Sequence, residues 1–305
     1  MAATSEAIRA VSTAEQQALD EAAVLKQKQR NSFIWRSVFA NLIVILFLVF
    51  AVFPVYFVIE AACRPGQSLY STTLQLFPTN PSLENFDYMI NHTQLLTWLR
   101  NSLFVAGLTT IVSVIVCTSA GYAFSRWRFF GREGLLTLLL AIQTFPAILS
   151  LIAIFVIFTQ LHLLDNLFGL VLVYASGAFV FSTWNMKGYF DTIPADLEEA
   201  ARVDGATPTQ AFIRVMLPLA RPVIAVTALF GFMAGWGDYI LAQTLLFSED
   251  KYTVMVGLIG LQQDYRQPWG WFAVGAIFAA VPVVVLFFFL QKNLTAGLTL
   301  GGVKG

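Results

Sequence analysis

The chain has 305 residues, of which 57% are hydrophobic and only 12% are charged, and its mean hydropathy is +0.70. Soluble domains carry about 25% charged residues, so this composition excludes an ordinary soluble domain and favours a membrane protein. The formal net charge of zero gives no sign of nucleic-acid binding. Cys63 and Cys117 are expected near opposite faces of the membrane, too far apart for a disulfide, and they lack the company of further metal ligands.

Six apolar segments predict an all-α integral membrane protein with six transmembrane helices, since each span needs about 20 apolar residues. A polar N-terminal arm, residues 1–36, precedes them, and the first span is expected to act as an uncleaved signal. Residues 37–291 form the predicted transmembrane domain, and residues 292–305 form a short tail. The spans are expected at about 37–62, 101–125, 135–158, 167–186, 223–247 and 271–290.

The basic residues predict the orientation, because cytoplasmic loops carry an excess of Lys and Arg. The N-terminal arm, the second-to-third loop, the fourth-to-fifth loop and the C-terminal tail hold 14 of the 18 Lys and Arg residues. The opposite loops hold Arg64, Arg100, Lys251 and Arg266. Both termini and the loop 187–222 are therefore expected in the cytoplasm.

The cytoplasmic loop contains the longest run dense in charge, Gly and Pro, from Asp196 to Pro218. Pro194 and the acids that follow it predict a helix that starts at Asp196, because both suit the first turn of a helix. Gly205 is expected to end this helix in a left-handed conformation.

A second helix is predicted directly afterwards, with Thr207 as its N-cap and Pro208 at its first position. Its apolar stripe consists of Ala211, Phe212, Val215 and Met216. The first helix offers small residues for close approach and the Glu199 carboxylate for a basic partner. On the residues alone, a solvated loop helix is the equal alternative.

The order Glu199-Ala200-Ala201, three residues, Gly205, nine residues and Val215-x-Leu217-Pro218 resembles the cytoplasmic EAA motif of permease subunits in ABC importers. Val215 stands where Ile is usual. In that family the motif forms the coupling helix, which docks in a cleft of a separate ATP-binding subunit. The resemblance implies ATPase coupling by Glu198, Glu199, Ala200, Ala201, Asp204, Gly205, Leu217 and Pro218.

Longer segments resemble the smaller permease subunit of maltose/maltodextrin importers, over roughly residues 36–305. They are 145–158, 184–212, 252–258 and 298–305. The resemblance implies a type I ABC importer permease fold in the bacterial cytoplasmic membrane. It also implies three partners: a second permease subunit, a dimer of ATP-binding subunits and an extracytoplasmic sugar-binding protein.

This chain is expected to bind no cofactor and to be no enzyme, because it contains no phosphate-binding loop of the G-x-x-x-x-G-K-[ST] type. ATP and Mg are expected in the partner ATPase. In the family the C-terminal tail lies against that ATPase, although a frayed end is the alternative. The residues concerned are Gly301, Gly302, Val303, Lys304 and Gly305.

Two further regions carry weaker predictions. Asp238 lies inside the fifth span, where an acid is costly and usually faces a polar interior. Trp236, Asp238 and Tyr239 are hypothesised to line the outer part of the pathway, with pairing of Asp238 to a neighbouring helix or to the other permease as the alternative. By resemblance, the outward loop Ser248 to Gly270 contacts the binding protein, unless it is merely solvated. Its polar candidates are Gln262, Gln263, Asp264 and Tyr265.

The sequence thus predicts a permease subunit that moves maltose or maltodextrin by alternating access. The same architecture could import trehalose or another oligosaccharide. An ion-coupled secondary transporter and a membrane scaffold are the rivals from other classes. The sequence does not identify the sugar, whether this subunit touches it, or the role of the N-terminal arm.

Overall fold

The computed structural model describes residues 33, 35–66, 80–262 and 268–301, and within them every regular element is a helix. The chain divides into two compact units, Met1–Val58 and Ile59–Gly305. All-helical architecture is what a bilayer requires of this composition, because a helix satisfies its backbone hydrogen bonds within one segment.

The described part of the first unit is one long helix. It runs over Trp35–Cys63, so that its last turn belongs to the second unit. Its apolar side chains are exposed along its length, as illustrated by Phe50, which is 77% exposed. A helix of this length and exposure is long enough to cross a bilayer.

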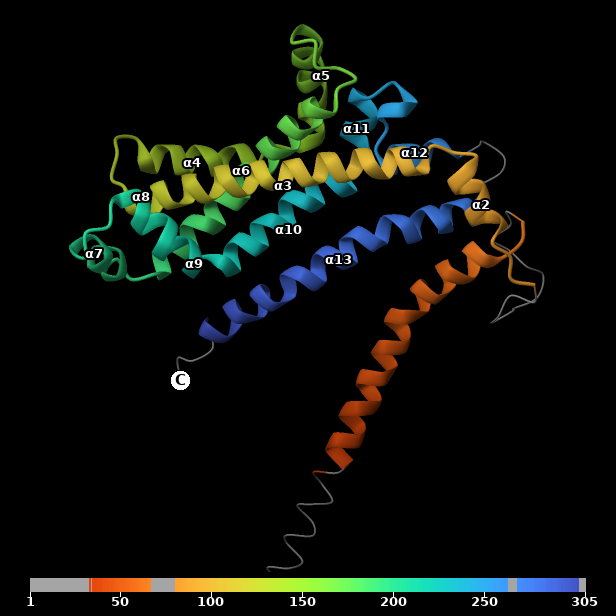
Figure 1. Ribbon diagram of the computed structural model, residues 1–305, viewed down its shortest axis with the longest axis horizontal. Helices are drawn as coiled ribbons and strands as arrows, with labels where there is room; N and C mark the ends of the chain where they lie inside the picture. Colours follow the sequence, from red (N-terminus) through yellow and green to blue (C-terminus); the bar gives the residue numbers. More distant parts are fainter. Residues whose placement is uncertain (1–32, 34, 67–79, 263–267, 302–305) are drawn as a thin grey trace, which may run out of the picture. The chain divides into compact units, whose positions relative to one another are not determined.

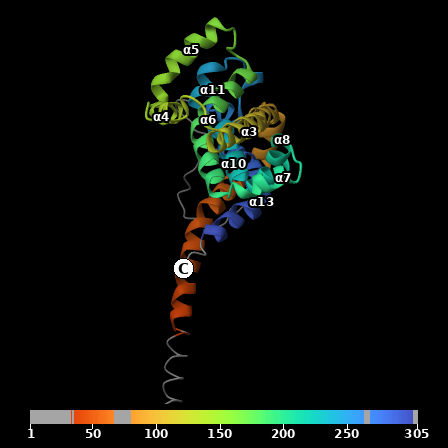
Figure 2. The ribbon, with the colours of Figure 1, turned by 90° about the vertical axis from the view of Figure 1, so that its left-hand side faces the viewer.

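The second unit is a bundle built around the long helix α3 (Leu95–Arg126). Helices α6 (Leu167–Thr192) and α10 (Arg221–Gly237) pack against α3, and α13 (Trp269–Gly301) packs against α10. Figure 1 shows these four helices running alongside one another, and Figure 2 looks at the bundle from its α7 end. The short helix α2 (Glu84–Asn91) contacts α13 at the opposite end.

Small residues set the close approach of these helices. A Cβ added at Gly235 of α10 would lie 2.8 Å from the Cα of Ala106 in α3. Beside it, Trp236 is 2% exposed and donates its indole N–H to the carbonyl of Ala279 in α13, at 3.1 Å. One turn of α10 therefore touches one neighbour with its backbone and holds another with a buried hydrogen bond.

The third apolar segment is broken in two. It consists of α4 (Arg132–Gln143), the short η1 (Ala147–Leu149) and α5 (Ser150–Gln160). Pro146 stands between the halves; a proline has no N–H to donate and disfavours helical geometry at the residue before it. The sequence predicted one span over 135–158, and the structure breaks it at Pro146.

The fifth apolar segment is also broken, in this case at Asp238. Helix α10 ends at Gly237, Asp238 is extended, and α11 (Ile240–Leu245) follows. At its other end α10 meets the preceding segment Pro208–Leu219 at an angle of 79°. The predicted continuous helix over 223–247 is therefore two helices.

Four described helices are long and apolar enough to cross a membrane. The number is five if Pro208–Leu219 and α10, which meet at 79°, together form one span. The four are Trp35–Cys63, α3, α6 and the part Trp269–Asn293 of α13. The two breaks explain why fewer than six continuous spans are found, since each half of the third segment is 12 residues or shorter.

Gly235→Ala should destabilise the bundle by about 1–3 kcal/mol, because the new methyl group meets the backbone of α3 rather than a movable side chain. The matched control is Gly107→Ala in α3, where an added Cβ meets nothing within 4 Å. Thermal unfolding of the full chain in detergent measures both. Equal melting temperatures for the two variants would contradict this packing.

Candidate functional site

Helix α7 (Asp196–Val203) opens the polar segment that joins α6 to α10. Its first turn carries Asp196, Glu198 and Glu199, which suit the positive end of the helix dipole. Gly205 has φ +88°, as predicted for a left-handed cap. The N–H of Gly205 donates to the Arg202 carbonyl and the N–H of Ala206 to the Ala201 carbonyl, the two bonds of a Schellman ending.

The second helix begins as the sequence predicted. Helix α8 (Pro208–Ala211) is capped by Thr207, whose hydroxyl accepts the N–H of Gln210 while the Gln210 side chain accepts the N–H of Thr207. The chain continues through a π-helix, η2 (Phe212–Met216), into α9 (Leu217–Leu219). The predicted apolar stripe is buried or half-buried.

Glu198 is the point at which α7 is fastened to the bundle. Its Oε1 accepts a hydrogen bond of 2.5 Å from the hydroxyl of Tyr122, near the end of α3. Its Oε2 lies 3.4 Å from Nε of Arg126, an ion pair rather than an aligned hydrogen bond. Arg126 also donates to the carbonyl of Ile193 at 2.7 Å, so that one side chain of α3 holds both the end of α6 and the start of α7.

The remaining face of α7 is open. Glu199, Ala200, Asp204 and Gly205 are exposed, and Ala201 is half-buried. Val203 is 87% exposed and Leu197 is 45% exposed, so this polar helix also presents apolar surface. The two neighbouring acids therefore differ: Glu198 is half-buried and bonded to α3, whereas Glu199 is exposed beside apolar surface. Leu217 is half-buried and Pro218 exposed.

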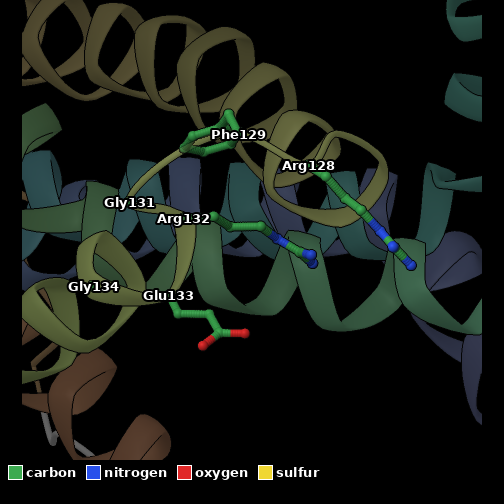
Figure 3. A pocket seen from close by; sticks show the side chains of 6 residues that line it. All are labelled: Arg128, Phe129, Gly131, Arg132, Glu133 and Gly134. Atoms are coloured by element: carbon green, nitrogen blue, oxygen red, sulfur yellow. The ribbon is translucent and has the colours of Figure 1, made fainter.

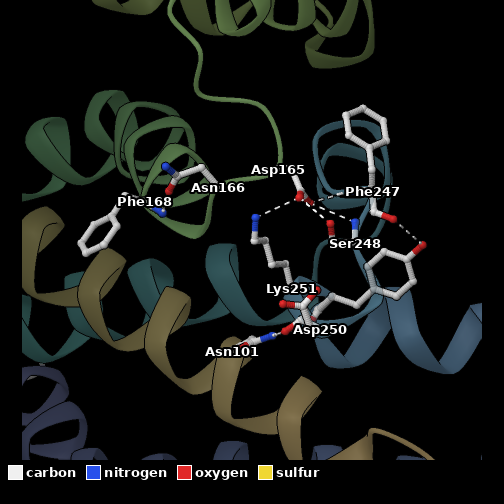
Figure 4. A network of polar contacts seen from close by, with 9 residues as sticks. Asn101, Asp165, Asn166, Phe168, Phe247, Ser248, Asp250 and Lys251 are labelled. Atoms are coloured by element: carbon white, nitrogen blue, oxygen red, sulfur yellow. Dashed lines mark hydrogen bonds and ion pairs between the residues drawn. The ribbon is translucent and has the colours of Figure 1, made fainter.

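A polar network closes the opposite end of the bundle, around Asp165 (Figure 4). Its carboxylate accepts the backbone N–H groups of Phe247 and Ser248, the Ser248 hydroxyl and Nζ of Lys251, at 2.6–3.0 Å. Asp165 has φ +53°, and its own N–H donates to the carbonyl of Leu245. The short connection between α5 and α6 is thereby tied to the chain that follows α11.

The electrostatics of this network favour the charged forms. Partial burial acts to raise the pKa of Asp165, but the hydrogen bonds from Ser248, Lys251 and Phe247 outweigh it and hold that pKa well below its usual range. The hydrogen bond to Asp165 raises the pKa of Lys251.

The first turns of α3 hold the same chain segment from another side. Trp98 donates its indole N–H to the Glu249 carbonyl, and Asn101 donates to the carbonyls of Asp250 and Tyr252. Two of these carbonyls belong to η3 (Glu249–Lys251) and the third directly follows it, ahead of α12 (Val254–Gly260). Residues about 150 positions apart are therefore joined at this end of the bundle.

Asp238 makes hydrogen bonds at the break in the fifth apolar segment. Its Oδ1 accepts the Tyr174 hydroxyl of α6 at 2.8 Å and the N–H groups of Leu241 and Ala242 at 3.0 and 3.2 Å. It thus caps α11 and pairs with a neighbouring helix, the alternative considered above. Tyr239 packs against the apolar cluster beside it. These contacts account for the carboxylate without a bound solute.

The other predicted site residues fall at the edges of the described regions. Gln262 is exposed, whereas Gln263, Asp264 and Tyr265 lie outside the described residues. Gly301 is the last residue of α13, and Gly302, Val303, Lys304 and Gly305 lie outside the described residues. Their predicted contacts stay predictions.

Residues 115–299 match the family of binding-protein-dependent transport system inner membrane components. This match includes α7 and most of the bundle. The chain belongs to this family. It is a multi-pass inner-membrane permease subunit of a bacterial ABC importer for carbohydrates, and such subunits are not enzymes.

Curated relatives cover nearly the whole permease. The maltodextrin transport system permease protein MdxG of Bacillus subtilis is 41% identical over 83% of this chain and 91% of its own length. The galactooligosaccharides permease GanQ of the same species is 38% identical over 88% and 96%. The maltose/maltodextrin permease MalG of Vibrio vulnificus is 38% identical over 85% and 93%.

A solved structure shares the fold. A chain of a bacterial ABC transporter that imports the acidic polysaccharide alginate superposes with a TM-score of 0.70 and 25% identity, over 84% of this permease and 95% of that chain. The fold is therefore that of known ABC importers.

The sequence reasoning missed the partners of Glu198. Tyr122 and Arg126 lie about 70 residues before it, and no local spacing links the two regions. The basic residue at the end of the second predicted span was the available signal, but it was used only for orientation. Val203 was missed because an apolar residue on an amphipathic helix is expected to face inward.

Tyr122→Phe should loosen α7, because it removes the hydroxyl that donates to Glu198. A hydrogen bond to a charged group contributes about 1.5–3 kcal/mol, so amide exchange over Asp196–Val203 should become about tenfold faster or more. Tyr239→Phe is the control, since the Tyr239 hydroxyl has no hydrogen-bond partner among the described residues. Unchanged exchange in Tyr122→Phe would show that Glu198 is not the fastening point.

Asp165→Asn should lower thermal stability at neutral pH but much less in acid. The lowered pKa of Asp165 means that its stabilising contribution is present above the unfolded pKa of about 3.9 and is lost as the pH falls toward the folded value. The difference in melting temperature between the parent and this variant should therefore shrink below about pH 4. Glu249→Gln, which changes an exposed acid outside the network, should show no such trend; a pH-independent difference for Asp165→Asn would contradict the assignment.

Proposed function

We propose that this permease carries maltose and maltodextrins. The proposal is supported by the 41% identity to MdxG and by two further permeases named for maltodextrin, MalD of Streptococcus pneumoniae at 38% and MalG at 38%. GanQ, named for galactooligosaccharides, is also 38% identical. Another oligosaccharide, including trehalose, is therefore the second candidate.

The proposed topology has six crossings with both termini in the cytoplasm, and the broken third and fifth segments each count as one crossing. The asymmetry of Lys and Arg supports it. In the bundle, the α3–α4 connection and α7 lie at one end, whereas α12 lies at the other (Figure 1). The Asp165 network is formed with residues that closely precede α12. The first end is proposed to be cytoplasmic.

The proposed mechanism couples a separate ATPase to the bundle through α7. The observation that carries it is the division between the two acids: Glu198 is bonded to Tyr122 and Arg126, while Glu199, Ala200 and Val203 are exposed. A partner that binds the exposed face of α7 moves this helix as a unit. Because Glu198 is bonded to Tyr122 and Arg126, α3 moves with it. The Schellman ending stops α7 at Gly205 and satisfies its last carbonyl groups, so that α7 stays a short, well-ordered helix.

The proposed assembly contains a second permease, a dimer of ATP-binding subunits and an extracytoplasmic sugar-binding protein. Within it, the Gln262–Tyr265 loop is proposed to contact the binding protein, and the tail Gly301–Gly305 is proposed to contact the ATPase. ATP and Mg would be bound by the partner ATPase. The family description specifies dependence on a binding protein. An alginate ABC transporter with 18% identity and a TM-score of 0.60 was solved in complex with its pentasaccharide-bound periplasmic protein.

An ion-coupled transporter working alone is a weaker reading. It would use a buried acid that titrates during transport. Asp238 is the only acid deep in the described membrane segments of the second unit, and its carboxylate already caps α11 and accepts from Tyr174. The pathway role of Trp236, Asp238 and Tyr239 stays a hypothesis; transport by Asp238→Asn with an unchanged range of sugars would count against it.

The identity of the transported sugar is tested by uptake into liposomes that contain the permease, its partner permease, the ATPase and the binding protein. Labelled maltotriose should accumulate when ATP is enclosed, whereas a galactooligosaccharide and trehalose should not. Accumulation of one of those sugars instead would reassign the substrate and leave the coupling mechanism intact. Accumulation of any sugar without the ATPase subunit would overturn the coupling mechanism itself.

Glu199→Lys should uncouple ATP hydrolysis from transport, because it reverses the charge on the exposed face of α7 without touching the Glu198 bonds. The number of sugars transported per ATP hydrolysed should fall by about tenfold or more, whereas sugar capture by the binding protein should be unchanged. Glu84→Lys makes the same charge reversal on an exposed acid in the first turn of α2, outside the loop predicted to contact the binding protein, and should keep the parent ratio. A normal ratio in Glu199→Lys would argue against coupling through this face.

A further inference from the structure

The connection between α3 and α4 exposes an unusual group of aromatic side chains. Trp127 is 58% exposed, Phe129 is 39% exposed and Phe130 is fully exposed. The connection joins a membrane-spanning helix to the broken third segment, so it lies where the apolar part of the bundle ends. Exposed aromatic residues at such an end are typical of the membrane–water interface.

Two arginines stand among these rings. The Arg128 side chain is exposed and, among the described residues, has no hydrogen-bond or ion-pair partner. Arg132 uses Nε to donate to the Phe124 carbonyl at 2.7 Å, which leaves its two terminal nitrogens for another acceptor. Figure 3 shows both guanidinium groups directed to the same side of the loop, with the Glu133 carboxylate turned away from them.

Most neighbouring charges are already paired within the protein. Glu198 is bound by Arg126 and Tyr122, as described above. Asp191 accepts from Lys187 and from Ser125, both at 2.6 Å, and also attracts Arg132 through space. Glu133 lies in the first turn of α4, where an acid suits the helix dipole. These side chains carry four positive and three negative charges, so the loop keeps an excess of positive charge. The cations are Arg126, Arg128, Arg132 and Lys187, and the acids are Glu133, Asp191 and Glu198.

The arginines line an open cavity of about 530 Å³, together with Phe129, Gly131, Glu133 and Gly134. Gly131 has φ +82°, a conformation that turns the chain directly into α4 and that other residues adopt only with strain. The cavity therefore combines two guanidinium groups, an aromatic wall and a backbone without bulky side chains.

We propose that this cavity binds the headgroup of an anionic phospholipid. Guanidinium groups bind phosphate oxygens in paired, directional hydrogen bonds. Basic pockets beside membrane helices on the cytoplasmic side recognise anionic headgroups, and the exposed rings beside this cavity suit the acyl–headgroup boundary. The rings distinguish a lipid from a soluble phosphate, because a soluble ligand gives them nothing to bury. In the proposed topology the site faces the inner leaflet, and it does not depend on which sugar is carried.

The site also lies next to the attachment of α7, the helix proposed to contact the ATPase. Arg126, which binds Glu198, is the last residue of α3 and is followed directly by Trp127, the first residue of the loop. A bound headgroup would hold the cavity loop while α7 is moved from its exposed face. The lipid would thus anchor the end of α3 against which α7 is fastened.

Binding is measured by native mass spectrometry of the full chain in its transporter complex, released from detergent with added phosphatidylglycerol or phosphatidylcholine. The parent should retain phosphatidylglycerol over phosphatidylcholine, and R128Q/R132Q should lower this retention by roughly 10- to 30-fold. R214Q/R221Q removes two exposed cations from the same end of the bundle and should retain the lipid. R128K/R132K should recover part of the binding, because it keeps the charge but not the paired hydrogen bonds.

A second variant guards against misfolding. Phe130 is fully exposed, so Phe130→Ser cannot disturb internal packing, yet it should weaken phosphatidylglycerol retention measurably. Equal losses in R128Q/R132Q and R214Q/R221Q would reduce the effect to general charge and overturn the site. Glycerol phosphate binding as tightly as phosphatidylglycerol would overturn a lipid as the ligand. Protection of residues 127–134 from hydrogen exchange by the ATPase subunit, but not by lipid, would assign the surface to a protein partner instead.

Discussion

The bonds that hold the Glu198 carboxylate connect the apolar bundle of this permease to its polar segment, α7 to α9. Tyr122 and Arg126 supply them from the last turns of α3, the helix on which α6 and α10 also pack. A carboxylate shielded from water is costly unless it is paired, so the attachment is specific to this residue. The neighbouring acid, Glu199, is exposed.

Breaks in membrane helices are subject to the same requirement, that buried polar groups be paired. An interruption leaves backbone groups that the bilayer cannot satisfy, and side chains satisfy such groups at two places in this bundle. Asp238 caps α11 and bonds to Tyr174, and Asp165 gathers the N–H groups of the chain after α11. These two aspartates therefore lie where the chain changes direction.

Local chemistry predicted much of the segment from α7 to α9. The Gly205 ending, the Thr207 cap and the apolar stripe follow from spacing alone, because each depends on residues within one or two turns. The partners of Glu198 and Asp165 could not be predicted in this way, since they come from residues about 70 to 85 positions away. The helix breaks were underestimated for a related reason: hydropathy counts apolar residues and is insensitive to whether the backbone continues through Pro146 or Asp238.

The most direct test of the account is a double-mutant cycle between α3 and α7, read as sugars transported per ATP hydrolysed in liposomes. Tyr122→Phe and Glu198→Ala should each lower the ratio. The double variant should be no worse than Glu198→Ala alone, because the hydroxyl acts only through that carboxylate. Independent effects that multiply in the double variant, or a ratio that none of the three changes alter, would contradict the transmission of movement through Glu198.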